Sequence, residues 1–219
     1  MPDVFHRSFF IQGPAGRLES LLWTAPDHPT LPVALVCHPH PMFGGTMHNK
    51  VVYQAAKAFH SSGIPVLRFN FRGTGLSEGA HDKGRGEQDD VAAAIHWLIQ
   101  EFPNRAVLLA GFSFGAWTGL RVGCREEIVS HLIGLGLPVD RTNLDYLKDC
   151  PKPKLIVQGG NDEFGSLENL QALFDAIPEP KKLVIVEGVD HFFAGKLPEV
   201  GAAITAWLHE QRLLPANSD

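Results

Sequence analysis

The sequence predicts an α/β protein built on a mostly parallel central sheet of about eight strands, with helices on both faces. Three observations carry this prediction. Apolar, β-branched runs of strand length alternate with longer segments of helical spacing; the first two strand-like runs have no helix between them; and no repeat, low-complexity tract or long linker divides the chain. At 219 residues the chain is expected to form a single domain over residues 1–219.

The expected strands share short length and a high content of valine, isoleucine, leucine and phenylalanine. They are residues 4–11, 18–23, 33–37, 66–71, 107–110, 132–137, 155–158 and 183–186. Helices are expected at residues 47–61, 87–101, 114–124, 167–176 and 198–212. The segment 87–101 is the clearest, because acidic residues open it and apolar residues repeat on one face. In such sheets catalytic groups sit in loops beyond the C-terminal strand ends.

Composition narrows the function classes. The formal net charge of -5 gives no electrostatic reason to expect nucleic acid. Three cysteines are too few for a disulfide framework, and their odd number fits a reducing compartment. The first residues lack the basic start and apolar run of a signal peptide, and no apolar run reaches the roughly 18 residues of a membrane helix. We therefore expect a cytoplasmic protein without nucleic-acid or membrane partners; its oligomeric state is not predicted.

The pattern Gly-x-Ser-x-Gly occurs twice, around Ser113 and around Ser77. A nucleophilic serine on a tight elbow needs a strand running into the turn and a helix leaving it, with small neighbours. Residues 107–110 abut the first copy and a helical segment follows it, whereas loop residues flank the second copy on both sides. The context predicts Ser113 as the nucleophile and Ser77 as a turn serine.

A serine hydroxyl needs a neutral imidazole to accept its proton. With this elbow the acid and then the histidine follow the serine in the chain, which leaves His131, His191 and His209. His131 is expected before a strand, at the wrong edge of the sheet, and His209 on the polar face of the last helix. His191 follows the last strand closely and is the predicted base.

The acid should lie in a loop after an earlier strand. Asp162 is the first carboxylate beyond residues 155–158, and its role would be to hold the imidazole tautomer and stabilise the imidazolium. The alternatives are Glu163, Asp140 and Asp190. Asp190 reads better as a turn former, since adjacent residues rarely point their side chains at each other. Asp140 is the main rival.

Two segments carry a family resemblance, CHPHPMFGGTMHNKVV at residues 37–52 and FNFRGTGLS at residues 69–77. Both resemble a compact bacterial group related to dienelactone hydrolases, and nearly the whole chain resembles the α/β-hydrolase superfamily. The resemblance implies an α/β-hydrolase fold and the same triad of Ser113, Asp162 and His191. Dienelactone hydrolases proper carry cysteine at the elbow, where this chain has serine.

An oxyanion hole requires backbone N–H groups, the first from the residue after the nucleophile, here Phe114. The second donor comes from the loop after residues 33–37. Pro39 and Pro41 have no amide hydrogen, so His40 and Met42 remain, and the spacing favours His40.

The histidines of the same loop raise the question of a metal site. His38, His40 and His48 are irregularly spaced, and no cysteine or carboxylate cluster accompanies them. We therefore expect a rigid loop rather than a metal centre, and no cofactor.

Residues 138–154 have room for only a short helix at about 142–149, so no cap domain is expected and the pocket should be open. Aromatic and methionine side chains beyond the strand ends are its candidate walls. They are Met42, Phe43, Phe164 and Phe192, with Phe114 and Phe193 as further candidates.

These features predict a serine hydrolase that works through an acyl-enzyme. A carboxylesterase acting on small or medium acyl esters fits an open site best. The alternatives are a thioesterase, lactonase or peptidase with the same triad, and, in another class, a catalytically silent binding module with this fold.

Overall fold

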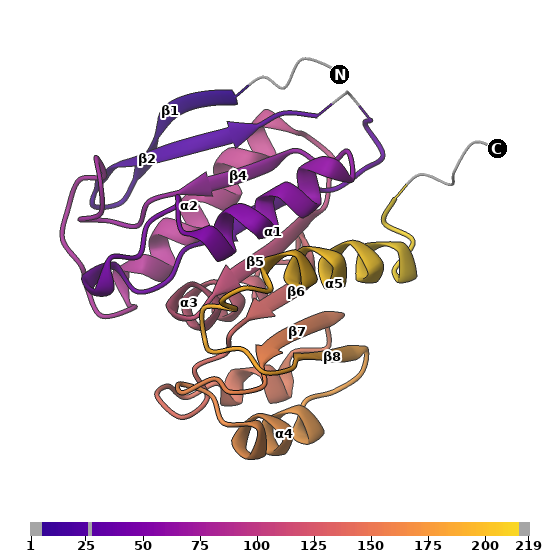
Figure 1. Ribbon diagram of the computed structural model, residues 1–219. Helices are drawn as coiled ribbons and strands as arrows, with labels where there is room; N and C mark the ends of the chain where they lie inside the picture. The colour runs from indigo at the N-terminus through magenta and orange to yellow at the C-terminus, as the bar shows by residue number, and fades with distance from the viewer. Residues whose placement is uncertain (1–5, 26–27, 215–219) are drawn as a thin grey trace.

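One eight-stranded sheet runs through the computed structural model, which describes residues 6–25 and 28–214 (Figure 1). The strand order is β1-β2-β4-β3-β5-β6-β7-β8. Strand β2 pairs antiparallel with β1 and β4, and all other pairs are parallel. The strands are β1 (His6–Gly13), β2 (Gly16–Trp23), β3 (Val33–Cys37), β4 (Val66–Phe69), β5 (Val107–Phe112), β6 (Val129–Leu135), β7 (Lys154–Gly159) and β8 (Lys181–Val186). The predicted α/β class, with its mostly parallel sheet, is confirmed.

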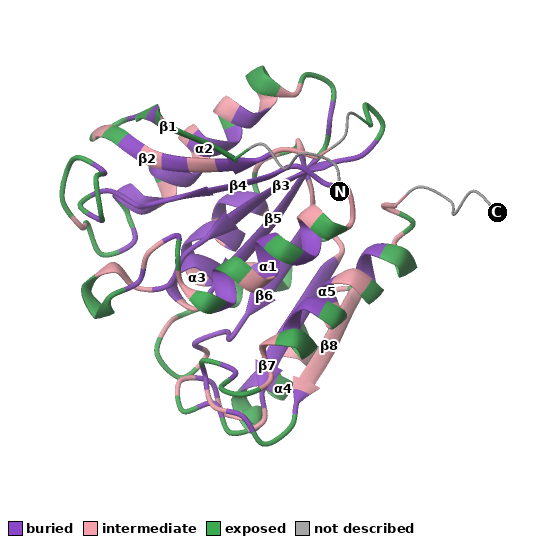
Figure 2. Ribbon diagram, turned by 45° about the horizontal axis from the view of Figure 1, so that its top comes forward, coloured by how far each residue is buried: buried purple, intermediate pink, exposed green. Residues whose placement is uncertain are grey.

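Five α-helices cover the sheet from both sides. Helices α1 (Lys50–Ser61) and α5 (Leu197–Glu210) lie together on one face, whereas α2 (Gly86–Glu101), α3 (Phe114–Gly123) and α4 (Leu167–Ala176) lie on the other (Figure 1). Strand β3 shows why both faces need cover: Leu35 packs in one core and Val36 in the other, because successive side chains point to opposite faces. The central strands are accordingly buried throughout, and edge strand β8 is only partly buried (Figure 2).

Several element boundaries differ from the predicted ones. Helix α1 begins at Lys50 and not at residue 47, because the Asn49 side chain accepts the N–H groups of Val51 and Val52 and caps the helix there. Strand β6 begins at Val129, so His131 lies within a strand and not before it. Residues 4–5 of the predicted first strand lie outside the described residues.

The connection from β6 to β7 holds one short 3-10 helix, Asp145–Asp149, and no separate cap domain. It lies within the segment predicted to form a short helix. The C-terminal edge of the parallel strands is therefore left uncovered by any inserted domain, and the predicted site residues lie in the loops there.

Among residues 6–25 and 28–214, no helix combines the length and apolar character needed to cross a membrane.

Candidate active site

Ser113 occupies a sharp turn between β5 and α3. Its φ of 55° and ψ of -116° form a strained conformation for a residue with a side chain. The Ser113 N–H donates to Leu135 O at 2.9 Å, which ties the turn to the neighbouring strand. The turn is possible only with glycines around it: a Cβ on Gly111 would lie 2.3 Å from Gly115 O, and one on Gly115 would lie 2.4 Å from Cys37 O. Both glycines of the motif are thus required by close backbone approach.

Asp162 and His191 come together from the loops after β7 and β8. Asp162 Oδ2 lies 2.8 Å from His191 Nδ1, and both side chains are almost completely buried. Asp162 Oδ1 accepts the N–H groups of Phe164 at 2.8 Å and Gly165 at 3.1 Å, while Oδ2 also accepts from Gln158 Nε2 at 2.8 Å. The carboxylate is therefore surrounded by donors that hold it in one orientation.

Aromatic rings enclose the His191 imidazole. Its ring centroid lies 5.0 Å from that of Phe112, 4.7 Å from that of Phe164 and 5.3 Å from that of Phe192. Ser113 and His191 line the same cavity of about 550 Å³. A hydroxyl and an imidazole thus line one cavity at the end of the sheet, and a buried carboxylate contacts the imidazole from behind.

The rival acids have other partners. Asp140 is exposed, and its carboxylate accepts from the backbone and hydroxyl of Ser166 and from the Asn169 amide, at the start of α4. Asp190 Oδ1 accepts the N–H groups of Phe192 and Ala194, so it forms the turn as expected. The Glu163 carboxylate accepts the backbone N–H of His191 at 3.2 Å, whereas the His191 ring contacts Asp162.

The second copy of the serine motif is part of a loop, as predicted. Ser77 is buried, and its hydroxyl donates to Asn70 O at 2.7 Å and accepts the Glu19 N–H at 2.9 Å. His209 is exposed on α5.

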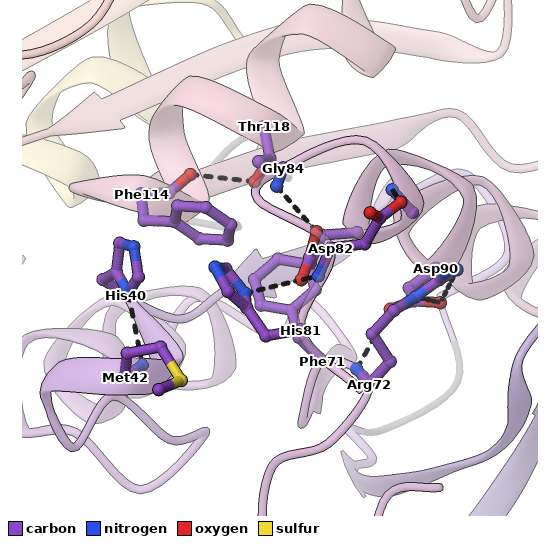
Figure 3. A network of polar contacts seen from close by, with 12 residues as sticks. His40, Met42, Phe71, Arg72, His81, Asp82, Gly84, Asp90, Phe114 and Thr118 are labelled. Atoms are coloured by element: carbon purple, nitrogen blue, oxygen red, sulfur yellow. Dashed lines mark hydrogen bonds and ion pairs between the residues drawn. The ribbon is translucent and has the colours of Figure 1, made fainter. Parts of the chain in front are cut away.

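The two predicted oxyanion donors have free N–H groups. Neither Phe114 nor His40 donates its backbone N–H to an acceptor among the residues that the structure describes. The Met42 N–H, by contrast, donates to His40 Nδ1 at 3.2 Å (Figure 3). This difference favours His40 over Met42 as the second donor, and the assignment of the oxyanion hole stays a prediction.

His38 is a structural histidine at the base of this loop. It is fully buried; Nδ1 donates to Pro39 O at 2.7 Å, and Nε2 accepts the Phe71 N–H at 3.0 Å. Burial lowers the pKa of His38 to about 3, so the ring is neutral in the folded protein. No group of three or more histidine, cysteine, aspartate or glutamate side chains within the described residues is arranged to hold a metal ion.

This burial predicts a pH dependence of stability. Below the ordinary histidine pKa of 6.5 the unfolded chain protonates His38 and the folded protein does not, so acid favours unfolding. The free energy of unfolding should fall by about 1.4 kcal/mol per pH unit from this residue alone, down to about pH 3. Urea denaturation of wild type and His38→Gln between pH 7 and 4 measures the difference, with His209→Gln as the exposed control. Equal slopes for all three proteins would contradict the prediction.

Four of the six candidate wall residues lie in the cavity that Ser113 and His191 line. Phe43, Phe164 and Phe192 line it, as does Phe114. Met42, which is 69% exposed, is not among the residues that line it. Phe193 is fully buried in the core beneath.

The sequence interpretation missed several residues of the cavity wall. They are Pro39, Gly44, Gly45, Asn49, His81, Lys83, Trp117, Pro138, Arg141 and Thr142. His81 packs against His40 and Phe114, with ring centroids 4.9 and 5.7 Å apart (Figure 3). The loops after β4 and β6 carry five of these residues, and the rule that placed the triad beyond strand ends also pointed to those loops.

The fold, the serine elbow and the buried acid–histidine pair together define the α/β-hydrolase class of protein. A sequence model of the alpha/beta hydrolase domain family matches residues 35–205, and the chain belongs to that family. An uncharacterized protein of Rickettsia prowazekii is 39% identical over 217 residues, which cover 95% of this chain and 89% of that protein.

Two solved structures are similar across almost their whole length. One is an alpha-beta serine hydrolase homologue from Coxiella burnetii, 38% identical, with a TM-score of 0.87 and coverage of 92% of this chain and 97% of that chain. The other is a serine hydrolase without lid from Xanthomonas campestris, 36% identical, with a TM-score of 0.87 and coverage of 98% and 99%. The protein is a compact α/β-hydrolase without a cap domain.

Proposed function

We propose that the protein is a serine carboxylesterase that cleaves small or medium acyl esters through an acyl-enzyme. The observation that carries the proposal is the 2.8 Å contact between Asp162 Oδ2 and His191 Nδ1 beside a cavity that Ser113 also lines. His191 would take the Ser113 proton as the hydroxyl attacks the ester carbonyl, and would return it to the leaving alcohol. A water molecule that His191 deprotonates would then attack the acyl-enzyme and release the carboxylic acid and free Ser113.

The oxyanion of each tetrahedral intermediate would accept the free N–H groups of Phe114 and His40. Asp162 would stabilise the imidazolium without taking its proton. The lidless site supports esters of modest size, since nothing covers a long acyl chain. A thioesterase or lactonase would use the same groups, so chain length and leaving group need a substrate panel. The three cysteines are free, which supports a cytoplasmic location.

Labelling by a fluorophosphonate probe tests the nucleophile. Such a probe phosphonylates a serine only when a neighbouring base activates it. We expect complete labelling of wild type and none of Ser113→Ala, read by intact-protein mass spectrometry. Ser77→Ala is the matched control, because it removes the serine of the other motif copy, and it should label like wild type after circular dichroism confirms folding. Absence of labelling in wild type would favour the silent binding module.

A proline substitution tests the second oxyanion donor. His40 has a φ of -55°, which a proline ring can adopt, so His40→Pro removes the N–H with little demand on the backbone. We expect kcat on 4-nitrophenyl butyrate to fall by about 10²- to 10³-fold, as for loss of one oxyanion donor. His40→Ala removes the same ring and keeps the N–H, so it should retain most of the activity. Equal losses in the two variants would move the role from the N–H to the side chain.

A further inference from the structure

The wall of the active-site cavity is cationic. Lys83 and Arg141 line it together with the imidazoles of His40, His81 and His191, and no aspartate or glutamate is among the described residues that line it. The chain as a whole carries a formal net charge of -5. Positive charge is therefore concentrated where a substrate binds, against the sign of the rest of the molecule.

Neither cation is neutralised by an ion pair. Elsewhere in the described chain, Arg and Lys side chains contact carboxylates directly, as in Arg72–Asp90 and Arg17–Glu78. No salt bridge within residues 6–25 and 28–214 involves Lys83 or Arg141. The carboxylate beside Arg141, that of Asp140, is hydrogen-bonded to Asn169 and Ser166. These bonds and the nearby Arg141 charge lower the pKa of Asp140.

The loop that carries Lys83 is built around a buried carboxylate. Glu87 is fully buried, and its two oxygens accept the N–H groups of Asp82 and Gly84, each at 2.8 Å. Lys83 lies between these anchored amides with a left-handed φ of 52°. Glu87 Oε1 also lies 2.7 Å from His81 Nδ1, in a geometry that is not a hydrogen bond. Figure 3 shows His81 beside His40 and Phe114, on the same side as this loop. The Glu87 carboxylate thus holds the loop backbone, and it is not among the residues that line the cavity.

Arg141 is positioned by an aromatic ring that also contacts the proposed base. Its guanidinium carbon lies 5.6 Å from the centroid of Phe164, and the Phe164 ring packs edge-on against His191 at 4.7 Å. The Arg141 N–H donates to Pro138 O at 3.0 Å, which fixes the backbone at this point. One ring therefore separates this cation from the catalytic imidazole.

Trp117 of α3 joins the two loops. A Cβ on Gly84 would lie 2.2 Å from the Trp117 ring, and Trp117 Nε1 donates to Asn143 O at 3.2 Å. The loop that carries Lys83 and the loop that carries Arg141 thus both contact the Trp117 side chain. Phe43 and Phe192, both at least half exposed, supply apolar walls to the same cavity. The cavity therefore offers both apolar surface and unpaired positive charge.

We propose that the natural substrate is an anionic ester, whose carboxylate or phosphate group binds between Lys83 and Arg141 while its apolar part lies on Phe43 and Phe192. This proposal rests on the proposed esterase function and names its substrate class. The two cations are specificity residues and take no part in bond cleavage. They act by Coulomb attraction, which favours an anion over a neutral group of the same size.

Matched substrates test the preference. Mono-4-nitrophenyl glutarate is anionic, and its methyl ester is neutral at the same chain length. We expect wild type to show a ratio of kcat/KM, anionic over neutral, well above one. Lys83→Met and Arg141→Met should each lower this ratio by about 5- to 10-fold, and salt should lower it in wild type. Lys57→Met and Arg125→Met remove exposed cations outside the cavity and should leave the ratio unchanged.

A second pair of substrates tests whether the anionic group lies on the acyl chain or on the leaving group. Butyryl-coenzyme A against butyryl-N-acetylcysteamine, followed by thiol release, places the charge on the leaving group as phosphate. A high ratio only for the glutarate pair assigns a carboxylate on the acyl chain, and a high ratio only for the thioester pair assigns a phosphate on the leaving side. Ratios near one for both pairs, insensitive to both substitutions, would overturn the proposal.

A binding measurement separates this proposal from the proposed function. Titration calorimetry of Ser113→Ala with monomethyl and dimethyl glutarate needs no catalysis, and the monoanion should bind at least about 5-fold tighter. If wild type resists fluorophosphonate yet the monoanion is preferred, the esterase function fails and the anion site stands. If wild type labels and both ligands bind equally, the esterase function stands and the anion site fails.

Discussion

Replacing Asp162 with asparagine is expected to lower kcat by about 10⁴-fold while the fold stays intact. The reason lies in the donors around the carboxylate. Oδ1 accepts two backbone N–H groups, from Phe164 and Gly165, which cannot rotate away. The asparagine oxygen must therefore stay on that side, and its NH₂ faces His191 Nδ1. The imidazole would then carry its proton on Nε2, the atom that has to accept the serine proton.

The matched control is Asp140→Asn, because Asp140 was the rival acid on sequence grounds and its side chain contacts Ser166 and Asn169 instead. We expect its kcat to stay within about 2-fold of wild type, as for a surface substitution away from the reacting groups. Stopped assays with 4-nitrophenyl butyrate and urea denaturation of both variants make the comparison. A large loss of kcat in Asp140→Asn with wild-type kcat in Asp162→Asn would exchange the two roles.

Loss of Asp90 is expected to be the most destabilising single change, at about 3–5 kcal/mol in the free energy of unfolding. Asp90 of α2 is fully buried. Its carboxylate accepts from Arg72 Nη2 at 2.7 Å, and Arg72 Nε donates to both carboxylate oxygens, at 3.1 and 3.0 Å. It also accepts the Arg72 backbone N–H at 3.0 Å (Figure 3). Asp90→Ala leaves the Arg72 guanidinium, with its side chain only 10% exposed, without its ion-pair partner. Urea denaturation at pH 7 measures the loss.

Two comparisons show whether the uncompensated charge is the cause. The double variant Arg72→Met, Asp90→Leu removes both charges and should recover much of the stability, since a buried ion pair is often replaceable by apolar residues. Glu78→Ala breaks the exposed pair with Arg17 and should change stability little. A double variant as unstable as Asp90→Ala would assign the loss to packing or hydrogen bonds and not to the buried charge.

Local patterns predicted the architecture and the loops in which the candidate site residues lie, for a physical reason. Strand and helix periodicity reflects which faces are buried, so the alternation of elements was readable without coordinates. The C-terminal ends of parallel strands meet at one edge of the sheet, so distance from a strand end brought Asp162 and His191 into one neighbourhood. The strand-to-helix context distinguished Ser113 from Ser77 because the elbow is a local backbone shape. The two glycines of the motif stand where a Cβ would collide with neighbouring backbone atoms.

Side-chain direction and cross-loop contact were decided only by the tertiary structure. Met42 and Phe43 are neighbours in the same 3-10 helix, yet only Phe43 lines the cavity. Lys83 and Arg141 are ordinary loop cations in the sequence, yet both line the cavity. The Lys83 loop is held by a buried glutamate, and the Arg141 guanidinium lies over the Phe164 ring. The chain by itself determined the sheet, the elbow and the loops that hold the site, whereas the charge and shape of the cavity arose from contacts between loops far apart in sequence, which no local pattern records.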